Sequence, residues 1–157
     1  MRKEIRLSSP ACTEKLGKEI GKKIKKPFPI LLFGDLGTGK TVFVRGLARG
    51  VGTSERVKSP SFTILYVYEG GGFPIYHFDL YRLDREGVGE LIRDGYFEKE
   101  GIVVIEWAEK FPMSYFPYSL KVEFLFIDEM TRELLFSSDD LEITNLIDEV
   151  IDEYSCN

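Results

Sequence analysis

Hydrophobic positions along the chain switch between helical and strand spacing, and this switching predicts the order of the elements. An apolar residue recurs every four positions from 12 to 24, directly after Ser9-Pro10, as on a helix whose N-cap is Ser9. Helical spacing returns after position 40 and again near the C-terminus. We expect helices at 10–26, 41–49, 85–97 and about 140–155, the last opened by a capping box from Asp139 to Glu142.

Short apolar runs predict strands between these helices. The run Ile102–Ile105 holds no polar residue, which is typical of a central strand buried on both faces. Three glycines at 70–72 and a turn at 128–131 each join two runs as an antiparallel hairpin. The expected strands are 3–7, 28–33, 64–68, 73–80, 102–105, 120–126 and 133–137. This order predicts a single α/β domain over 1–157, with a mainly parallel central sheet, added antiparallel hairpins and flanking helices.

The segment after the strand at 28–33 carries the most specific motif of the chain. Residues 34–41 read Gly-Asp-Leu-Gly-Thr-Gly-Lys-Thr and match the P-loop pattern G-x-x-x-x-G-K-[ST]. Between a strand and a helix, such a loop turns its backbone N–H groups toward the phosphates of a nucleotide. Lys40 is expected to face solvent over the β- and γ-phosphates, and the Thr41 hydroxyl to ligate Mg²⁺. The sequence therefore predicts a P-loop NTPase fold that binds a nucleoside triphosphate.

Two carboxylates are candidates for the acidic partner that a phosphate loop needs to hold Mg²⁺ and to polarise water. Asp79 lies at the end of one apolar strand, and Glu106 closes the strand at 102–105. Acids at the carboxyl ends of buried parallel strands lie on the ligand-binding edge of an open α/β sheet. An ordinary solvated acid is the alternative for each, and the sequence does not rank the two.

Two further features near the motif allow two interpretations each. The loop Ser59-Pro60-Ser61-Phe62-Thr63 supplies hydroxyls where other phosphate-loop proteins sense the γ-phosphate, and a plain serine-rich turn fits the spacing equally well. Trp107, beside Glu106, is expected either in the core, as for most aromatic residues, or at an exposed contact.

The nucleotide is expected to be ATP. The Asn-Lys-x-Asp sequence of GTPases is missing, and the nearest approach, at 145–148, lacks the lysine. A P-loop small-molecule or nucleotide kinase is the alternative, because kinases use the same loop. Such kinases usually carry an arginine-bearing lid, and the chain between Asp79 and Glu106 offers only Arg82, Arg85 and Arg93.

The charge distribution bears on the partners. The net charge is −5, but residues 1–26 hold nine Lys/Arg against three acids, and residues 128–157 hold ten acids and one base. The cluster Lys22, Lys23, Lys25 and Lys26 allows an RNA-binding arm; we favour a solvated helix face that meets the acidic tail. Strong binding of nucleic acid by this chain alone is not expected.

Cysteine, histidine and hydropathy patterns exclude other classes. Cys12 and Cys156 stand at opposite ends of the chain, so we expect free thiols of a reducing compartment rather than a metal site or a disulfide. A single histidine, His77, excludes a zinc site built on several histidines. Apolar runs stay well below the ~18 residues of a membrane span, and no signal-peptide core is present. We expect a soluble, cytoplasmic protein.

Four segments together resemble the TsaE (YjeE) family, the bacterial ATPases needed to make threonylcarbamoyladenosine in tRNA. The segments are 34–41, Val57–Thr63, His77–Arg82 and Ile105–Trp107, and the resemblance covers about residues 8–136. Ser61 stands where the family usually has threonine, and Ala108 where proline commonly follows the tryptophan. The C-terminal helix lies outside the pattern. The resemblance implies a Mg²⁺-dependent ATPase that acts with the TsaB–TsaD complex to support repeated turnover and reaches tRNA only indirectly.

The resemblance also implies roles for individual residues. Thr41 and Glu106 would bind Mg²⁺, Asp79 would complete the metal shell or position the attacking water, and Thr63 would sense the γ-phosphate, so that Lys40, Asp79, Glu106 and Thr63 are the implied catalytic residues. The adenine would lie between the first helix and the late hairpin. The implied nucleotide-binding residues are Ser9, Pro10, Gly34, Leu36, Gly37, Thr38, Gly39, Lys40, Thr41, Thr131 and Arg132. The implied switch or partner-facing residues are Ser59, Pro60, Ser61, Phe62 and Trp107.

Overall fold

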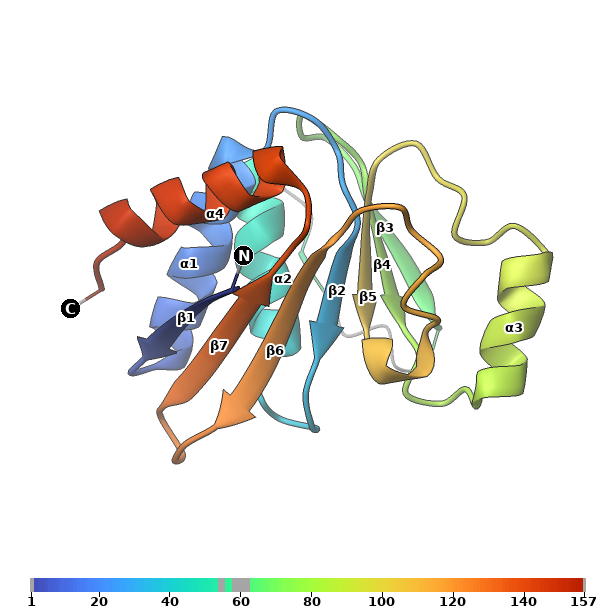
Figure 1. Ribbon diagram of the computed structural model, residues 1–157, viewed down its shortest axis with the longest axis horizontal. Coiled ribbons are helices and arrows are strands. Elements are labelled where there is room, and N and C mark those ends of the chain that lie inside the picture. Colours follow the sequence, from blue (N-terminus) through green and yellow to red (C-terminus); the bar gives the residue numbers. More distant parts are fainter. Residues whose placement is uncertain (1, 54–55, 58–62, 157) are drawn as a thin grey trace.

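A seven-stranded sheet forms the centre of the molecule in a computed structural model that describes residues 2–53, 56–57 and 63–156 (Figure 1). The strand order is β1-β7-β6-β2-β5-β4-β3. The four central strands run parallel, and antiparallel partners flank them: β3 beside β4, and β7 and β1 beyond β6. The strands are β1 (Arg2–Leu7), β2 (Ile30–Phe33), β3 (Leu65–Tyr68), β4 (Ile75–Asp79), β5 (Ile102–Glu106), β6 (Leu120–Phe126) and β7 (Arg132–Ser137). The predicted parallel centre with added hairpins is confirmed.

Helices cover the two faces of the sheet unequally. One face packs on α1 (Pro10–Lys23), α2 (Lys40–Val51) and α4 (Leu141–Glu153), whereas α3 (Arg85–Arg93) belongs to a smaller core on the other face and stands apart in Figure 1. The strand β5 contributes alternate residues to both cores and is buried along its whole length, as its apolar run predicts. Within the described residues, no helix is both long and apolar enough to cross a membrane.

The helix starts follow the predicted capping pattern, with one correction. Ser9 is the N-cap of α1, and its hydroxyl accepts a hydrogen bond from the backbone N–H of Cys12 (3.2 Å). The N-cap of α4 is Asp140 rather than Asp139, because the extended backbone of Asp140 brings its carboxylate to the N–H of Ile143 (3.0 Å). Two adjacent aspartates offer the same local signal, so sequence spacing alone placed the cap one residue early.

Four glycines let α1 and α2 approach backbone to backbone. Gly17 and Gly21 of α1 face the α2 backbone, and Gly46 and Gly50 of α2 face the α1 backbone. A Cβ atom added at Gly46 would lie 1.9 Å from the carbonyl oxygen of Glu14, well inside van der Waals contact. The glycine spacing of four residues on each helix puts both pairs on one face. This contact fixes the start of α1 beside the start of α2.

The basic end of α1 meets the acidic helix α4. The Lys23 ammonium lies 2.7 Å from the Glu149 carboxylate and 3.4 Å from that of Glu153. The hydrogen bond from Lys23 lowers the pKa of Glu149, and the same contact raises the pKa of Lys23. The interpretation of the basic cluster as a helix face that meets the acidic tail is confirmed for Lys23.

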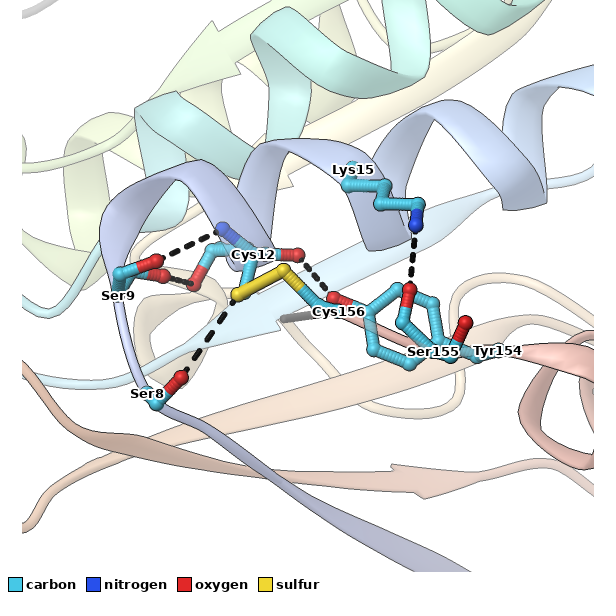
Figure 2. The surroundings of a disulfide bond; sticks show 8 residues. Ser8, Ser9, Cys12, Lys15, Tyr154, Ser155 and Cys156 are labelled. Carbon is cyan, nitrogen blue, oxygen red and sulfur yellow. Dashed lines mark hydrogen bonds between the residues drawn. A yellow bond between two sulfur atoms is a disulfide. The ribbon is translucent and has the colours of Figure 1, made fainter.

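The expectation of two free thiols is wrong. Cys12, in the first turn of α1, forms a disulfide with Cys156, which follows α4, and the two Cα atoms are 5.7 Å apart (Figure 2). The Tyr154 hydroxyl donates to the carbonyl of Cys12 (2.7 Å), and burial raises the pKa of this hydroxyl to about 12, so that it stays a donor. A separation of 144 residues gives no local sequence signal; the pairing follows from the packing of α4 on α1. The cysteines therefore give no support to a reducing compartment.

The glycine contact between α1 and α2 predicts that Gly46→Ala lowers the free energy of unfolding by about 1–3 kcal/mol, the usual cost of overpacking. The matched control is Gly89→Ala in α3, where the added Cβ would meet only the Arg93 guanidinium at 3.4 Å. There, the higher helix propensity of alanine should leave stability unchanged or raise it by up to about 1 kcal/mol. Urea denaturation of both variants measures the difference. Equal effects at the two positions would contradict the close backbone contact.

The disulfide predicts that a reducing agent lowers the melting temperature of the wild-type protein. Closing so long a loop restricts the unfolded chain, and such bonds typically stabilise by about 2–4 kcal/mol. Melting curves with and without dithiothreitol provide the measurement, with Cys156→Ser as the control that should not respond. A wild-type melting temperature that dithiothreitol leaves unchanged would show that the bond does not form in solution.

Candidate functional site

The glycine-rich loop connects the carboxyl end of β2 to the start of α2, as the motif predicts. Gly37 and Gly39 have φ angles of 76° and 101°, which residues with side chains rarely adopt, so the loop depends on glycine at these positions. The Glu109 carboxylate accepts from the N–H of Gly34 (2.8 Å), and the Arg132 guanidinium donates to the carbonyl of Gly37 (3.2 Å). Side chains distant in sequence therefore hold the loop at its start and in its middle.

Lys40 does not face solvent as expected: it is 4% exposed. Its ammonium donates to the carbonyls of Gly34 and Asp35, the second at 3.0 Å, and lies 4.2 Å from the centre of the Trp107 ring. Burial lowers the pKa of Lys40, although the carboxylates of Glu106, Glu109, Asp79 and Asp35 act against this shift. The ammonium thus occupies the inner side of the loop, which a sequence motif does not reveal.

Glu106 lies directly against the start of α2. The Thr41 hydroxyl donates to its carboxylate, at 3.1 Å from Oε2 and 3.3 Å from Oε1. Asp79 is the register partner of Glu106 on the parallel strand β4, and both side chains are 3% exposed. One Asp79 oxygen accepts from the backbone N–H of Tyr81 (2.9 Å). Both acids therefore lie at the carboxyl edge of the sheet, and the contact with Thr41 distinguishes Glu106.

Trp107 belongs fully to neither of its two expected environments. It is partly exposed, its ring covers the Lys40 ammonium, and it packs 5.1 Å from the ring of Tyr81. Its φ angle is 60°, in the left-handed region that bulky residues seldom occupy. Such backbone strain clusters at functional sites. The residue therefore forms a wall of the site beside Glu106.

A cavity of about 280 Å³ opens beside the loop. It brings together residues of α1, the loop, α2, β4, β5 and the β6–β7 turn. Most of the residues predicted from the sequence line this cavity: Pro10, Leu36, Gly37, Thr38, Gly39, Lys40, Thr41, Asp79, Glu106, Trp107 and Arg132.

Four other predicted residues lie outside this lining. Ser9 caps α1, and Gly34 lines a neighbouring cavity. Thr131 donates its N–H to Asp128 in the β6–β7 turn. Thr63 is exposed, although the carbonyl of the next residue accepts from the N–H of Asp79 (2.8 Å). The positions Ser59, Pro60, Ser61 and Phe62 fall outside the described residues.

Sequence reasoning missed several members of the site. Thr13, Val42 and Met130 also line the cavity, and Nε2 of His77 contacts the Glu106 carboxylate. Thr13 lies one helical turn after the N-cap Ser9. Its place in the first turn of a capped helix could have marked it as a candidate, because Ser9 and Pro10 were already predicted to lie near the nucleotide. Met130 lies in the turn that was predicted at 128–131, but nothing in the turn motif points toward the loop.

The site fits a nucleotide in two respects. A Cβ atom built at Gly37 would meet no atom within 4 Å, so the space beside the loop backbone is open. The Nε atom of Arg132 is buried and has no hydrogen-bond partner within the described part of the chain. The described residues contain no cluster of three or more His, Cys, Asp or Glu side chains that could hold a metal ion. Mg²⁺ sites that rely on one or two protein ligands plus phosphate oxygens need no such cluster.

Comparisons with known proteins agree with one family. The family model described as "Threonylcarbamoyl adenosine biosynthesis protein TsaE" matches residues 7–134. A relative named tRNA threonylcarbamoyladenosine biosynthesis protein TsaE from Nostoc sp. is 37% identical over 148 residues, which cover 92% of this chain and 91% of the relative. A protein of the same name from Aquifex aeolicus is 36% identical over 134 residues, covering 84% and 93% of the two chains.

A solved structure shows the same fold. The crystal structure of Bacillus subtilis YdiB superposes with a TM-score of 0.77 and 28% sequence identity, over 97% of this chain and 95% of that one. The family match spans the loop, both strand-end acids and the β6–β7 turn that together line the cavity. The chain belongs to the TsaE family.

Proposed function

We propose that the protein is a Mg²⁺-dependent ATPase required for threonylcarbamoyladenosine modification of tRNA, and that it acts in the cytoplasm with the TsaB–TsaD complex. One observation carries the proposal: the Thr41 hydroxyl of a complete P-loop donates to a buried strand-end carboxylate, Glu106, at the wall of the cavity. The tRNA role rests on the family and on the printed names of the relatives.

The loop supplies the phosphate site. Backbone N–H groups of residues 36–41 and the N-terminus of α2 attract negative charge. Lys40 already lies buried on the inner side of the loop, bound to the carbonyls of Gly34 and Asp35. Nucleotide binding exchanges these carbonyl contacts for phosphate oxygens, and the Trp107 ring limits the freedom of the ammonium during this exchange.

Thr41 and Glu106 would hold the cation, and Asp79 would position the attacking water. Bound Mg²⁺ would neutralise charge on the phosphates. Because one Asp79 oxygen is engaged by the backbone of Tyr81, the carboxylate has a fixed orientation suited to accepting a proton from water. Thr63 remains our candidate for sensing the γ-phosphate. Pro10 and Thr13 of α1, with Met130 and Arg132 of the late hairpin, line the same cavity and would receive the adenosine end.

The effect on tRNA would pass through protein contacts. The net charge is −5, and Lys23 of the basic cluster is engaged by α4. Salt-dependent binding of the tRNA backbone needs a free basic surface. An acidic chain of this kind is better suited to bind the TsaB–TsaD pair in a nucleotide-dependent way than to bind tRNA itself.

The phosphate-site assignment predicts opposite effects of Lys40→Met on binding and stability. Loss of charge-assisted hydrogen bonds, each worth about 1.5–3 kcal/mol, should weaken ATP binding by roughly 10- to 100-fold. The melting temperature without nucleotide should stay the same or rise. Burial disfavours the charged form of Lys40, so an apolar side chain of similar length removes this cost to folding. Calorimetric titration and thermal melts measure both, with the exposed Lys26→Met as control. Unchanged ATP affinity would contradict the assignment.

The proposed activity predicts release of inorganic phosphate from ATP and Mg²⁺, with ATP preferred over GTP. It also predicts that repeated rounds of tRNA modification by TsaB–TsaD require this chain and ATP. Glu106→Gln should bind ATP at least as well in the absence of metal, because one negative charge is lost, but should hydrolyse it at least roughly 10-fold more slowly. Glu123→Gln, on the exposed side of β6, is the matched control. A phosphorylated small-molecule acceptor would favour the kinase alternative, and tight binding of bare tRNA at physiological salt would contradict the partner-mediated mechanism.

A further inference from the structure

A buried line of polar side chains runs through the sheet to the candidate metal ligand. The Tyr68 hydroxyl lies 3.0 Å from Nδ1 of His77, and Nε2 of His77 lies 2.5 Å from Oε2 of Glu106. The same carboxylate accepts from the Thr41 hydroxyl. The exposed fractions of Tyr68, His77 and Glu106 are 2%, 0% and 3%. Four side chains from β3, β4, β5 and α2 thus form one connected chain.

The sheet register produces this alignment. On the parallel strands β4 and β5, His77 lies opposite Val104 and Asp79 opposite Glu106. Tyr68 pairs with Ile75, two residues before His77, on the antiparallel neighbour β3. Residues two apart on a strand point to the same face, so the three side chains meet diagonally on the face that carries α2.

Both ring nitrogens of His77 are engaged in the line. Nε2–H donates to the Glu106 carboxylate, and Nδ1 faces the Tyr68 hydroxyl, which can act as donor or acceptor. A partner at each nitrogen gives the ring one fixed orientation. Polar groups buried to this extent are costly unless each is satisfied, and here each satisfies its neighbour.

We propose that His77 is a positioning residue: held by Tyr68, it fixes the Glu106 carboxylate in the orientation that meets Thr41. This inference rests on the proposed function, in which Thr41 and Glu106 act on the nucleotide and its cation. His77 lines no part of the nucleotide cavity and acts only through Glu106. The competing role is purely structural, in which the polar line serves stability and leaves the site unaffected.

Two amide substitutions separate these roles. Glutamine is long enough to place an N–H near the position of the imidazole Nε2, whereas asparagine is too short to reach Glu106. His77→Gln and His77→Asn both bury an amide, so their costs to folding are comparable. Tyr68→Phe leaves His77 in place and removes only the hydroxyl that orients it.

The first readout needs neither metal nor nucleotide. Trp107 is the only tryptophan and follows Glu106 directly, so its fluorescence reports the surroundings of the carboxylate. We expect a shifted emission in His77→Asn, a wild-type emission in His77→Gln, and an intermediate change in Tyr68→Phe.

The second readout is ATP binding in EDTA, which should stay within about twofold of wild type in all three, because the phosphate loop is untouched.

The third readout is hydrolysis with Mg²⁺. Loss of a side chain that orients a metal ligand typically costs roughly 10–100-fold in activity or metal affinity. We expect a loss in this range in kcat for His77→Asn, with little change in KM for ATP, and substantial rescue in His77→Gln. Should His77→Asn fail to fold, Tyr68→Phe and His77→Gln carry the test: lower kcat in the first and near-wild-type kcat in the second support the positioning role.

Two results would overturn the inference. One is equal kcat and equal Trp107 emission in the glutamine and asparagine variants. The other is a loss of metal-free ATP binding that parallels the loss of thermal stability, which indicates a structural role alone. Absence of hydrolysis in the wild-type protein would instead refute the proposed function, and the emission of Trp107 would still decide whether His77 positions Glu106.

Discussion

The arrangement of this protein depends on one buried carboxylate that must be satisfied by hydrogen bonds. Glu106 ends a strand that is buried along its whole length, and only 3% of the residue is exposed. A charge out of water is expensive unless donors surround it. Thr41 and His77 both contact Oε2 of this carboxylate, so the start of α2, the end of β5 and the middle of β4 are joined there.

A second constraint places the remaining walls of the cavity around that carboxylate. The glycines of α1 and α2 allow the two helix backbones to touch, and this contact brings Pro10 and Thr13 beside the phosphate loop. On the other side, Arg132 extends from the start of β7 to the carbonyl of Gly37, and its guanidinium stacks 4.7 Å from the Phe126 ring. Residues of the short motif therefore form one wall of the site, and residues from elements distant in the sequence form the other walls.

Local signals in the sequence were sufficient for the central architecture and the loop. The apolar run at 102–105, the glycine-rich motif at 34–41 and the acid after each strand each reflect a requirement met within a few residues. Their convergence at one edge follows from the rule for parallel strands. The Ser9 cap and the antiparallel hairpins are equally local.

Features that depend on tertiary packing could not be predicted in the same way. The disulfide joins Cys12 to Cys156 across almost the whole chain, and the two cysteines come together because α4 packs on α1. Lys40 is buried because carbonyls of its own loop and the Trp107 ring enclose it, which a motif that names only residue types does not encode. The contact of Tyr68 with His77 requires knowledge of the β3–β4 register, and a single histidine in a sequence carries no such information.

We propose that Thr41 and Glu106 hold the cation of a nucleotide whose phosphates lie in the glycine-rich loop. The decisive measurement is a crystal structure of the protein with Mg²⁺ and a non-hydrolysable ATP analogue. We expect phosphates against the backbone of residues 36–41 and a cation about 2.0–2.1 Å from Oγ1 of Thr41, on the side of the Glu106 carboxylate. Phosphates bound elsewhere, or a cation held by Asp79 without Thr41, would contradict the proposal.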